Sequence, residues 1–193
     1  ISQNTSLSTP ELGQIIADTF VQKCASQCYG QAATLSVTDL AEFSYSVPDA
    51  LNAFARSITE MITKDGKYSA VSNARNQTRE FATSSRIDQI DLAHFAQKIG
   101  NTEGTALIKA LKSAVKYNLT STNMTNAYGI SIYFPYQRTS YVDKAVSTYK
   151  SIGMDDDYST CIREFASMEV SGQAAAGVGG YTMPQILTGG YGS

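Results

Sequence analysis

The chain has 193 residues, which is long enough for one α/β domain with a sizeable core. Its 15 basic and 17 acidic residues give a formal net charge of -2 at pH 7 and are spread along the sequence, so the basic surface of a nucleic-acid-binding protein is not expected. No stretch approaches the roughly 18 to 20 consecutive apolar residues of a membrane-spanning helix.

The first third of the sequence predicts a helix, a strand and a second helix. Ser8-Thr9-Pro10-Glu11 is typical of a helix start, and the apolar residues after it recur at helical spacing until about Gly30. Residues 33–40 alternate apolar and hydroxylated β-favouring side chains, so we expect a strand there, ending near Asp39, with Leu35 and Val37 on one face. The second helix is expected to start at residues 46–49 and to end at Asp65-Gly66.

The remaining sequence predicts five more helices and one more strand. Ala127–Phe134 is the second strand, because apolar and polar side chains alternate along it and Pro135 ends it. Residues 171–193 are rich in Gly, Ala and Ser and offer little to bury, so they are predicted to form a tail or linker after a domain of residues 1–170. Helical spacing predicts the five helices at Tyr68–Phe81, Ile87–Ile99, Thr105–Tyr117, Tyr141–Tyr149 and Tyr158–Val170.

The predicted elements are mostly helices, with only two strands. Sheets usually contain about four to six strands, and an isolated pair is marginal in water. We therefore predict an α/β fold in which helices pack on a sheet whose remaining strands come from an upstream segment or chain. On this interpretation the sequence, which does not begin with methionine, belongs to a longer precursor.

The region from about Ser8 to Ser171 resembles the part of bacterial clostripain-like cysteine peptidases that follows the nucleophile. The segment GISIYFPY, residues 129–136, is the most specific element of the resemblance, and TLSVTDL, residues 34–40, is moderately specific. The helices are generic. In chain order the similar segments are ATLSVTDL, QIDLAHFAQKI, NAYGISIYFPY and SYVDKAVSTYKSIGMDDDYSTCIREFASMEVSG.

This resemblance implies a caspase-like α/β fold with a mostly parallel sheet between helices and a His–Cys dyad at the carboxyl edge of the strands. Family members are extracellular endopeptidases that cut after Arg or Lys. Both dyad residues, and the acidic residue that receives the basic side chain, belong to the region before the matched one. The chain is therefore expected to be the C-terminal, non-catalytic part of such a peptidase, extracellular or at the bacterial cell surface, with the upstream polypeptide as its partner.

The residues that could carry chemistry within the chain are few, and we predict no catalytic residue and no metal site. His94 is the only histidine and falls inside a predicted helix, while Cys161 lies in an amphipathic helix, where a buried thiol is typical. Cys24 and Cys28 are one helical turn apart, but a zinc site needs about two further ligands. The run Asp155-Asp156-Asp157 lacks the glycine and glutamate of an EF-hand loop. No cofactor is expected, although the resemblance leaves calcium open.

Three residues are candidates for contact with a substrate peptide. Ligands of open α/β sheets bind beyond the carboxyl ends of the strands. Thr38 and Asp39 follow the first predicted strand, and Tyr136 follows the second, so all three are expected to border a substrate cleft. Asp39 has an alternative role as the cap of the next helix.

Two other functions stay open on the sequence alone. One is a non-catalytic interaction or cell-surface module with a peptidase-like framework but no dyad. The other is a free-standing helical binding domain in which GISIYFPY is a buried hairpin edge.

Overall fold

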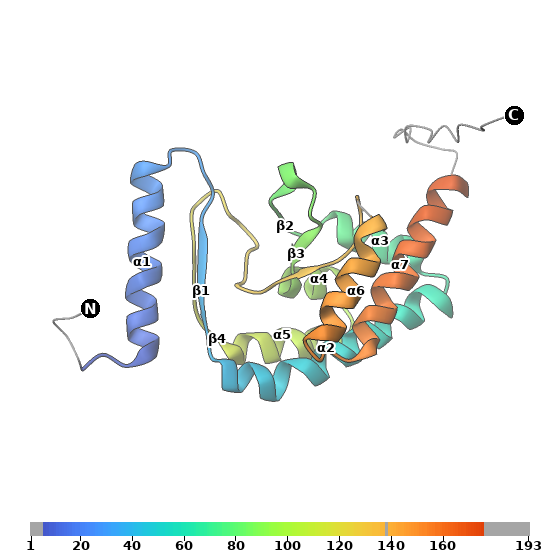
Figure 1. Cartoon of the computed structure of the whole chain (residues 1–193), viewed down its shortest axis with the longest axis horizontal. Helices are drawn as coiled ribbons and strands as arrows, with labels where there is room; N and C mark the ends of the chain where they lie inside the picture. Colours follow the sequence, from blue (N-terminus) through green and yellow to red (C-terminus); the bar gives the residue numbers. More distant parts are fainter. Residues whose placement is uncertain (1–5, 138, 176–193) are drawn as a thin grey trace, which may run out of the picture.

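A computed structural model describes residues 6–137 and 139–175, in which helices surround two small antiparallel sheets (Figure 1). The helices are α1 (Thr9–Gln27), α2 (Leu40–Thr63), α3 (Tyr68–Asn76), α4 (Leu92–Ile99), α5 (Thr102–Ala114), α6 (Val142–Ser151) and α7 (Asp156–Ala175), with 3-10 turns at Thr83–Ser85 and Thr139–Tyr141. The strands are β1 (Thr34–Thr38), β2 (Glu80–Phe81), β3 (Gln89–Asp91), β4 (Val115–Thr120) and β5 (Ser131–Tyr133). None of the described helices is both long and apolar enough to cross a membrane.

Caps set the beginnings of the first two helices. Ser8 and Glu11 form a capping box at the start of α1, as the sequence predicts. Asp39 accepts hydrogen bonds from the backbone N–H groups of Ala41 and Glu42 and begins α2 at Leu40. The predicted start of this helix at residues 46–49 is therefore too late, because the cap lies further upstream and Pro48 is accommodated inside the helix.

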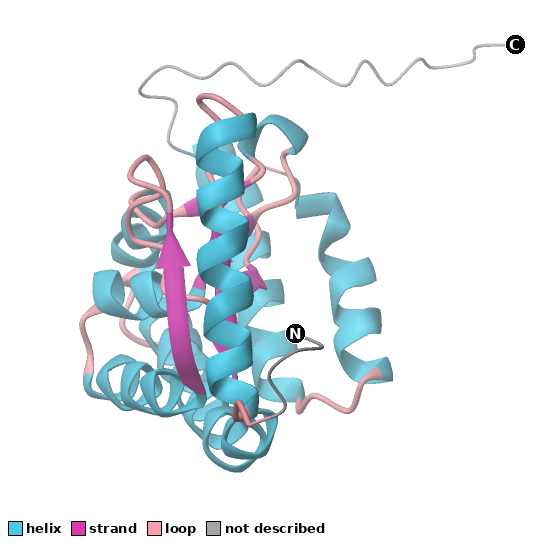
Figure 2. Ribbon diagram, turned by 90° about the vertical axis from the view of Figure 1, so that its left-hand side faces the viewer, coloured by secondary structure: helices cyan, strands magenta, loops and turns pink. Residues whose placement is uncertain are grey.

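Helix α1 and the two-stranded sheet β1–β4 form one layer of the molecule. The strands pair antiparallel, with Leu35 opposite Leu119 and Val37 opposite Tyr117. Figure 2 shows α1 in front of this sheet, and the Tyr117 hydroxyl donates a hydrogen bond to Asp18 at 2.6 Å. The approach is close: a Cβ atom added to Gly13 would lie 2.8 Å from both γ-carbons of Val37.

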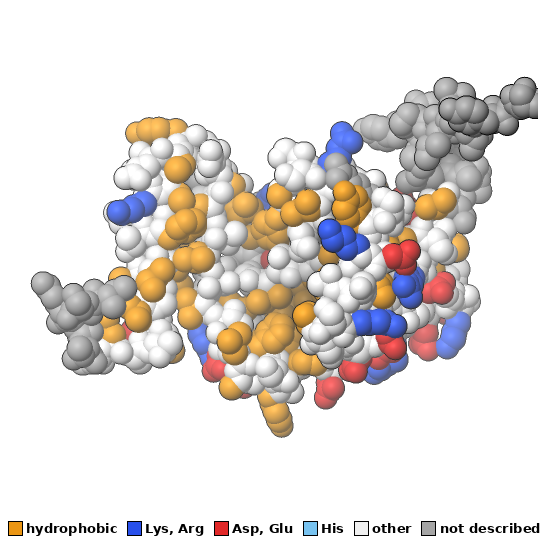
Figure 3. All heavy atoms as spheres, in the orientation of Figure 1, with side chains coloured by type: hydrophobic (Ala, Val, Ile, Leu, Met, Phe, Trp, Pro, Cys, Tyr) orange, Lys and Arg blue, Asp and Glu red, His pale blue; other side chains and the backbone are white. Residues whose placement is uncertain are grey.

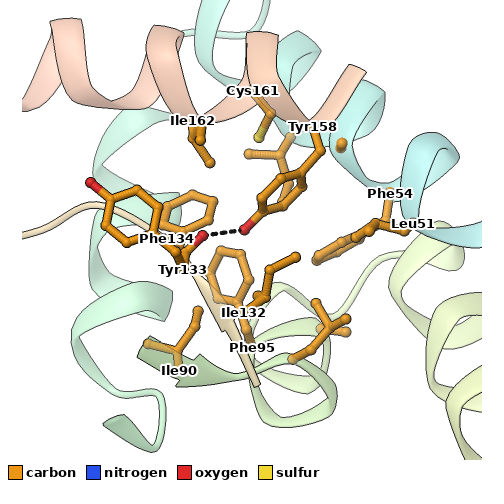
Figure 4. Packing of buried hydrophobic residues seen from close by; sticks show 14 of the residues in the cluster. Leu51, Phe54, Ile90, Phe95, Ile132, Tyr133, Phe134, Tyr158, Cys161 and Ile162 are labelled. Atoms are coloured by element: carbon orange, nitrogen blue, oxygen red, sulfur yellow. Dashed lines mark hydrogen bonds between the residues drawn. The ribbon is translucent and has the colours of Figure 1, made fainter. Parts of the chain in front are cut away.

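The main core lies on the other side of the molecule, where α2 packs against α5 and α7 beside the three-stranded sheet β2-β3-β5. A run of aromatic contacts crosses it, from Phe54 to Phe95 to Phe134 to Phe165, with ring centroids between 4.6 and 5.8 Å apart. The buried Tyr158 hydroxyl donates to the Tyr133 carbonyl oxygen at 2.6 Å, which fixes α7 to β5 (Figure 4).

A buried ionic group joins α3 to the turn after β5. Arg75 is 1% exposed; its guanidinium donates to Glu80 at 3.0 Å and to the Phe134 carbonyl oxygen at 3.1 Å, and lies 3.5 Å from the fully buried Asp88. Asp88 in turn accepts from the backbone N–H groups of Tyr136 and Gln137. Because each buried charge has a charged or hydrogen-bonded partner, this group fixes the chain after β5.

The structure corrects the prediction of a mostly parallel sheet, because both sheets are antiparallel. The two predicted strands also lie in different sheets. Strand pairing within the chain explains both differences: β1 pairs with β4 and β5 pairs with β3. We expected the strand partners of β1 and β5 to come from an upstream segment or chain. Each of these strands instead has one partner inside the chain, so the expectation is wrong for that edge.

Several predicted boundaries are also wrong. The predicted helix Thr105–Tyr117 ends at Ala114 and continues as β4, and the predicted helix Ile87–Ile99 starts only at Leu92, after β3. The predicted strand 127–134 is regular only at β5. Helix α7 continues to Ala175, five residues into the predicted tail, and the rest of that tail, residues 176–193, lies outside the described residues.

Candidate functional site

The most distinctive feature of the described surface is an unpaired sheet edge along β1. Ser121 donates its backbone N–H to Ala33 at one end of the β1–β4 ladder. Because hydrogen-bonded pairs alternate in an antiparallel ladder, Leu35 and Val37 direct their backbone groups toward β4, and Thr34 and Ser36 direct theirs to the open side. The outer side of β1 can therefore accept another strand.

A second strand end lies across the same hollow. Strand β5 is the outer strand of its sheet, and its Tyr133 N–H is already donated to the Tyr149 hydroxyl at 3.2 Å. The start of β5, at Ser131, is open and faces the hollow, which has a volume of about 280 Å³. Its walls are Thr34, Leu35, Ser36, Phe81, Gly129, Ile130 and Ser131. Figure 3 shows the molecular surface notched between the part that carries α1 and the rest.

The wall formed by residues 127–130 is held in place by polar contacts. Ser36 donates its hydroxyl to the Gly129 carbonyl oxygen at 2.8 Å, and Asn118 donates its amide to the Ala127 carbonyl oxygen at 2.8 Å. Asp91 accepts from the Tyr128 backbone N–H at 2.6 Å. These contacts come from three strands, so the hollow is a fixed feature of the fold.

Helix α1, which packs on both strands of this sheet, leaves apolar surface uncovered. Ile15, Ile16 and Phe20 are 46%, 45% and 43% exposed, although Ala17 and Val21 on the same helix are buried against the sheet. An amphipathic helix that covers a complete sheet normally buries its whole apolar stripe. The half-exposed stripe and the open edge of β1 belong to the same layer and indicate surface that a further polypeptide segment could cover.

The three predicted substrate contacts lie in two different places. Thr38 ends β1 and Asp39 caps α2, so they lie where the β1–β4 layer meets the helices; both oxygens of Asp39 are engaged, by the cap and by Lys116 at 3.8 Å. Tyr136 follows the other sheet, where its ring lies under the Arg75 guanidinium at 5.1 Å. The two strand ends are not neighbours in one sheet, so the structure does not assemble these residues at one sheet edge.

The histidine and the buried cysteine occupy separate structural positions. His94 Nδ1 accepts the Arg79 backbone N–H at 2.8 Å, and burial lowers the pKa of its imidazole. Cys161 is fully buried, and that burial raises the pKa of its thiol to about 12. A thiol with so high a pKa is a poor nucleophile, and its hydrogen-bond partner is Thr59. Cys24 and Cys28 are free thiols on and just after α1.

The acidic run before α7 makes separate contacts with neighbouring elements. Asp155 accepts from the Asn52 amide, Asp157 pairs with Arg56, and Asp156 pairs with Lys150 at 3.1 Å. Among the residues that the structure describes, no group of three or more His, Cys, Asp and Glu side chains is arranged to hold a metal ion.

Comparison with known proteins adds no relative. No family model, no curated protein and no solved structure matches this chain. The geometry of the site supports the binding of an extended segment along β1.

Only part of this site is predictable from the sequence. The strand that carries the open edge is predicted, but the residues that hold the opposite wall, Asp91 and Asn118, are not. Asp91 could have been found as a helix cap, because it precedes the apolar run of α4 and has the residue type preferred at that position.

Proposed function

We propose that this chain is the C-terminal, non-catalytic portion of a secreted bacterial cysteine endopeptidase that cleaves after Arg or Lys. In this proposal an upstream polypeptide carries the His–Cys dyad, and the present chain supports the sheet on which the dyad is placed. The resemblance of GISIYFPY and TLSVTDL to clostripain-like peptidases gives the proposal its family. Thr38, Asp39 and Tyr136 would contact the peptide substrate.

The observation that supports the proposal best is the unpaired edge of β1, in the same layer as the half-exposed apolar stripe of α1. A two-stranded sheet is marginal in water, whereas a strand added along β1 would bury backbone groups and apolar side chains together. A strand from the upstream polypeptide, hydrogen-bonded to Thr34 and Ser36, would extend the sheet and cover that surface.

Activity and association can be tested together. The chain alone is expected to leave Arg and Lys reporter peptides intact, and the same chain produced with the upstream segment of its precursor is expected to hydrolyse them. Replacing the cysteine of the upstream dyad by alanine should abolish the activity and leave association intact. Hydrolysis by the isolated chain, free of contaminating protease, would contradict this division of roles.

The edge can be tested with one substitution and a matched control. Thr34→Pro removes an N–H that points away from β4, so it should leave the stability of the isolated chain nearly unchanged. It should weaken association with the upstream polypeptide by roughly tenfold, through one lost hydrogen bond and the clash of the ring with the added strand. Thr34→Val keeps the N–H and should bind normally.

The same experiment separates the proposal from its rival. Association through β1 without any hydrolysis would favour a non-catalytic interaction or cell-surface module with the same framework. Equal association of Thr34→Pro and Thr34→Val would show that the partner binds elsewhere, and would remove the structural support for both functions.

A further inference from the structure

A second cavity, distinct from the hollow beside β1, lies between the connection from β2 to β3 and helix α6. Its volume is about 290 Å³, which is at the lower end of the range for small-ligand sites. One wall comes from the chain just before and within β3, another from Tyr133 of β5, and the third from α6 with the turn before it. The lining residues are Arg86, Ile87, Gln89, Tyr133, Tyr141, Lys144, Ala145, Thr148 and Tyr149.

The cavity is lined by aromatic and aliphatic side chains together with two positively charged ones. Three tyrosines and Ile87 supply the apolar surface, and Ile87 and Tyr141 are each 46% exposed, so the cavity opens to solvent. Arg86 and Lys144 supply two cations, and no acidic residue lines the cavity. Figure 3 shows basic side chains next to hydrophobic ones on the face of the molecule that carries α6.

The nearby acidic groups are engaged elsewhere. Asp143, next to Lys144 in sequence, pairs with Arg163 of α7 at 3.1 Å, and Asp88 is buried against Arg75. Within residues 6–137 and 139–175, neither Arg86 nor Lys144 has an ion-pair partner. Two cations without a counter-charge at an apolar cavity attract an anion and disfavour a cation.

A further hydrogen-bond donor faces the same cavity. The Tyr149 hydroxyl oxygen accepts the Tyr133 backbone N–H, and no described residue accepts the hydroxyl proton. Tyr149 is only partly buried and lines the cavity, so its proton is available to a bound acceptor. An anionic acceptor gains more from such a donor than a neutral one does, because charge-assisted hydrogen bonds are stronger.

We propose that this cavity binds a carboxylate attached to an aromatic or similarly bulky apolar body. The body would lie among Tyr133, Tyr141 and Ile87, and the carboxylate would be bound by Arg86, Lys144 and the Tyr149 hydroxyl. Two sources have this chemistry: a free aromatic acid and the C-terminal aromatic residue of a peptide. The inference is independent of the proposed peptidase role, because it uses a different face of the molecule.

Titration of the isotope-labelled chain with matched probes tests the site. N-acetyl-phenylalanine, its uncharged amide and 3-phenylpropionate would each be followed by the NMR shifts of amides on α6 and before β3. Both acids should shift the Ile87 and Ala145 signals, and the amide should bind roughly tenfold more weakly because it lacks the charge. Tighter binding of the acetylated residue assigns a peptide C-terminus, and tighter binding of 3-phenylpropionate assigns a free acid.

Variants locate the anion within the cavity. Arg86→Gln and Lys144→Gln should each weaken binding of the acids by roughly tenfold and leave the weaker binding of the amide unchanged. Lys112→Gln, on an exposed position of α5, is the matched control and should bind like the unmodified chain. Equal affinity for acid and amide, or the absence of shifts up to about 10 mM acid, would overturn the proposal.

Discussion

At the scale of single residues, Asp91 and His94 connect the beginning of α4 to the segments on both sides of it. Asp91 accepts the His94 backbone N–H at 2.9 Å and the Tyr128 N–H at 2.6 Å, while His94 accepts the Arg79 N–H. Burial raises the pKa of Asp91 and lowers the pKa of His94. For His94, the charges of Lys98 and Arg79 lower the pKa further. The folded state therefore favours a neutral imidazole, which can accept a hydrogen bond at Nδ1.

The depressed pKa of His94 gives a testable dependence of stability on pH. Below its ordinary value near 6.5, the unfolded chain takes up the proton before the folded chain does, so acidification through that range destabilises the fold. His94→Asn keeps an acceptor for the Arg79 N–H and cannot titrate. Urea unfolding at about pH 7.5 and about pH 5.5 should show a smaller loss of stability in the variant.

The titration of Asp91 does not account for a difference in pH dependence between the His94→Asn variant and the unmodified chain. Because its pKa is raised in the folded state, its contribution to stability improves as the pH falls through the range above its ordinary value, which is opposite to the effect of His94. Both chains contain Asp91, so its contribution largely cancels. The same loss of stability in the variant and the unmodified chain would show that His94 is not responsible.

At the scale of secondary-structure elements, the contact of Gly13 with Val37 sets the distance between α1 and the β1–β4 sheet. Gly13→Ala would place a methyl carbon 2.8 Å from both γ-carbons of Val37. Overpacking of this kind costs about 1 to 3 kcal/mol, against a gain of roughly 1 kcal/mol in helix propensity. We expect Gly13→Ala to lower the free energy of unfolding by about 1 kcal/mol.

A double-mutant cycle checks the physical cause. Val37→Ala removes both γ-carbons, so in that background Gly13→Ala should raise the free energy of unfolding by about 0.5 to 1 kcal/mol. Chemical denaturation of the four chains measures the change of sign. The same destabilisation by Gly13→Ala in both backgrounds would mean that α1 is held by other contacts.

Sequence reasoning identified the elements whose signals are local. Such signals are the capping box at Ser8, the alternation in β1 and the apolar stripes of α2 and α7. Each depends only on residues close together in the sequence, and each of these elements is present. It failed where helix and strand patterns join without a break. Val115 lies four residues after Leu111 and so continues the apolar spacing of the helix. Residues 116–120 alternate as a strand, however, and their pairing with β1 makes the segment from Val115 onward β4.

The short strands and their pairing could not be predicted from the sequence. Strands β2 and β3 contain two and three residues, too few to show alternation. In the connection between them, Ala82, Arg86 and Asp88 have positive φ. Glycine is the usual sequence signal for such a conformation, and none of these positions has it. At the site, Asp39 was predictable as a cap, but the hollow between β1 and β5 depends on contacts about ninety residues apart, such as Ser36 with Gly129.

At the scale of the whole molecule, the helical core and the layer of α1, β1 and β4 differ in how much apolar surface they bury. The helical side has a continuous core that includes Ile58 and Phe134, both fully enclosed. The layer of α1, β1 and β4 has few residues as deeply buried, and α1 packs mainly on the two strands. Cooperative units with little buried apolar surface open at lower free energy than the core.

Hydrogen exchange should reveal this difference in the isolated chain. The Phe134 N–H, donated to the buried Asp88 carbonyl oxygen just beyond the paired residues of β3 and β5, should exchange only on global unfolding. The Leu35 and Val37 amides should exchange at least roughly tenfold faster, through opening of the β1–β4 layer. If an added strand covers the open edge of β1, these two amides should gain protection when the upstream polypeptide binds, while Phe134 changes little. Equal protection of all three amides in the isolated chain would mean that the layer is stable by itself, and the open edge would then need no further strand.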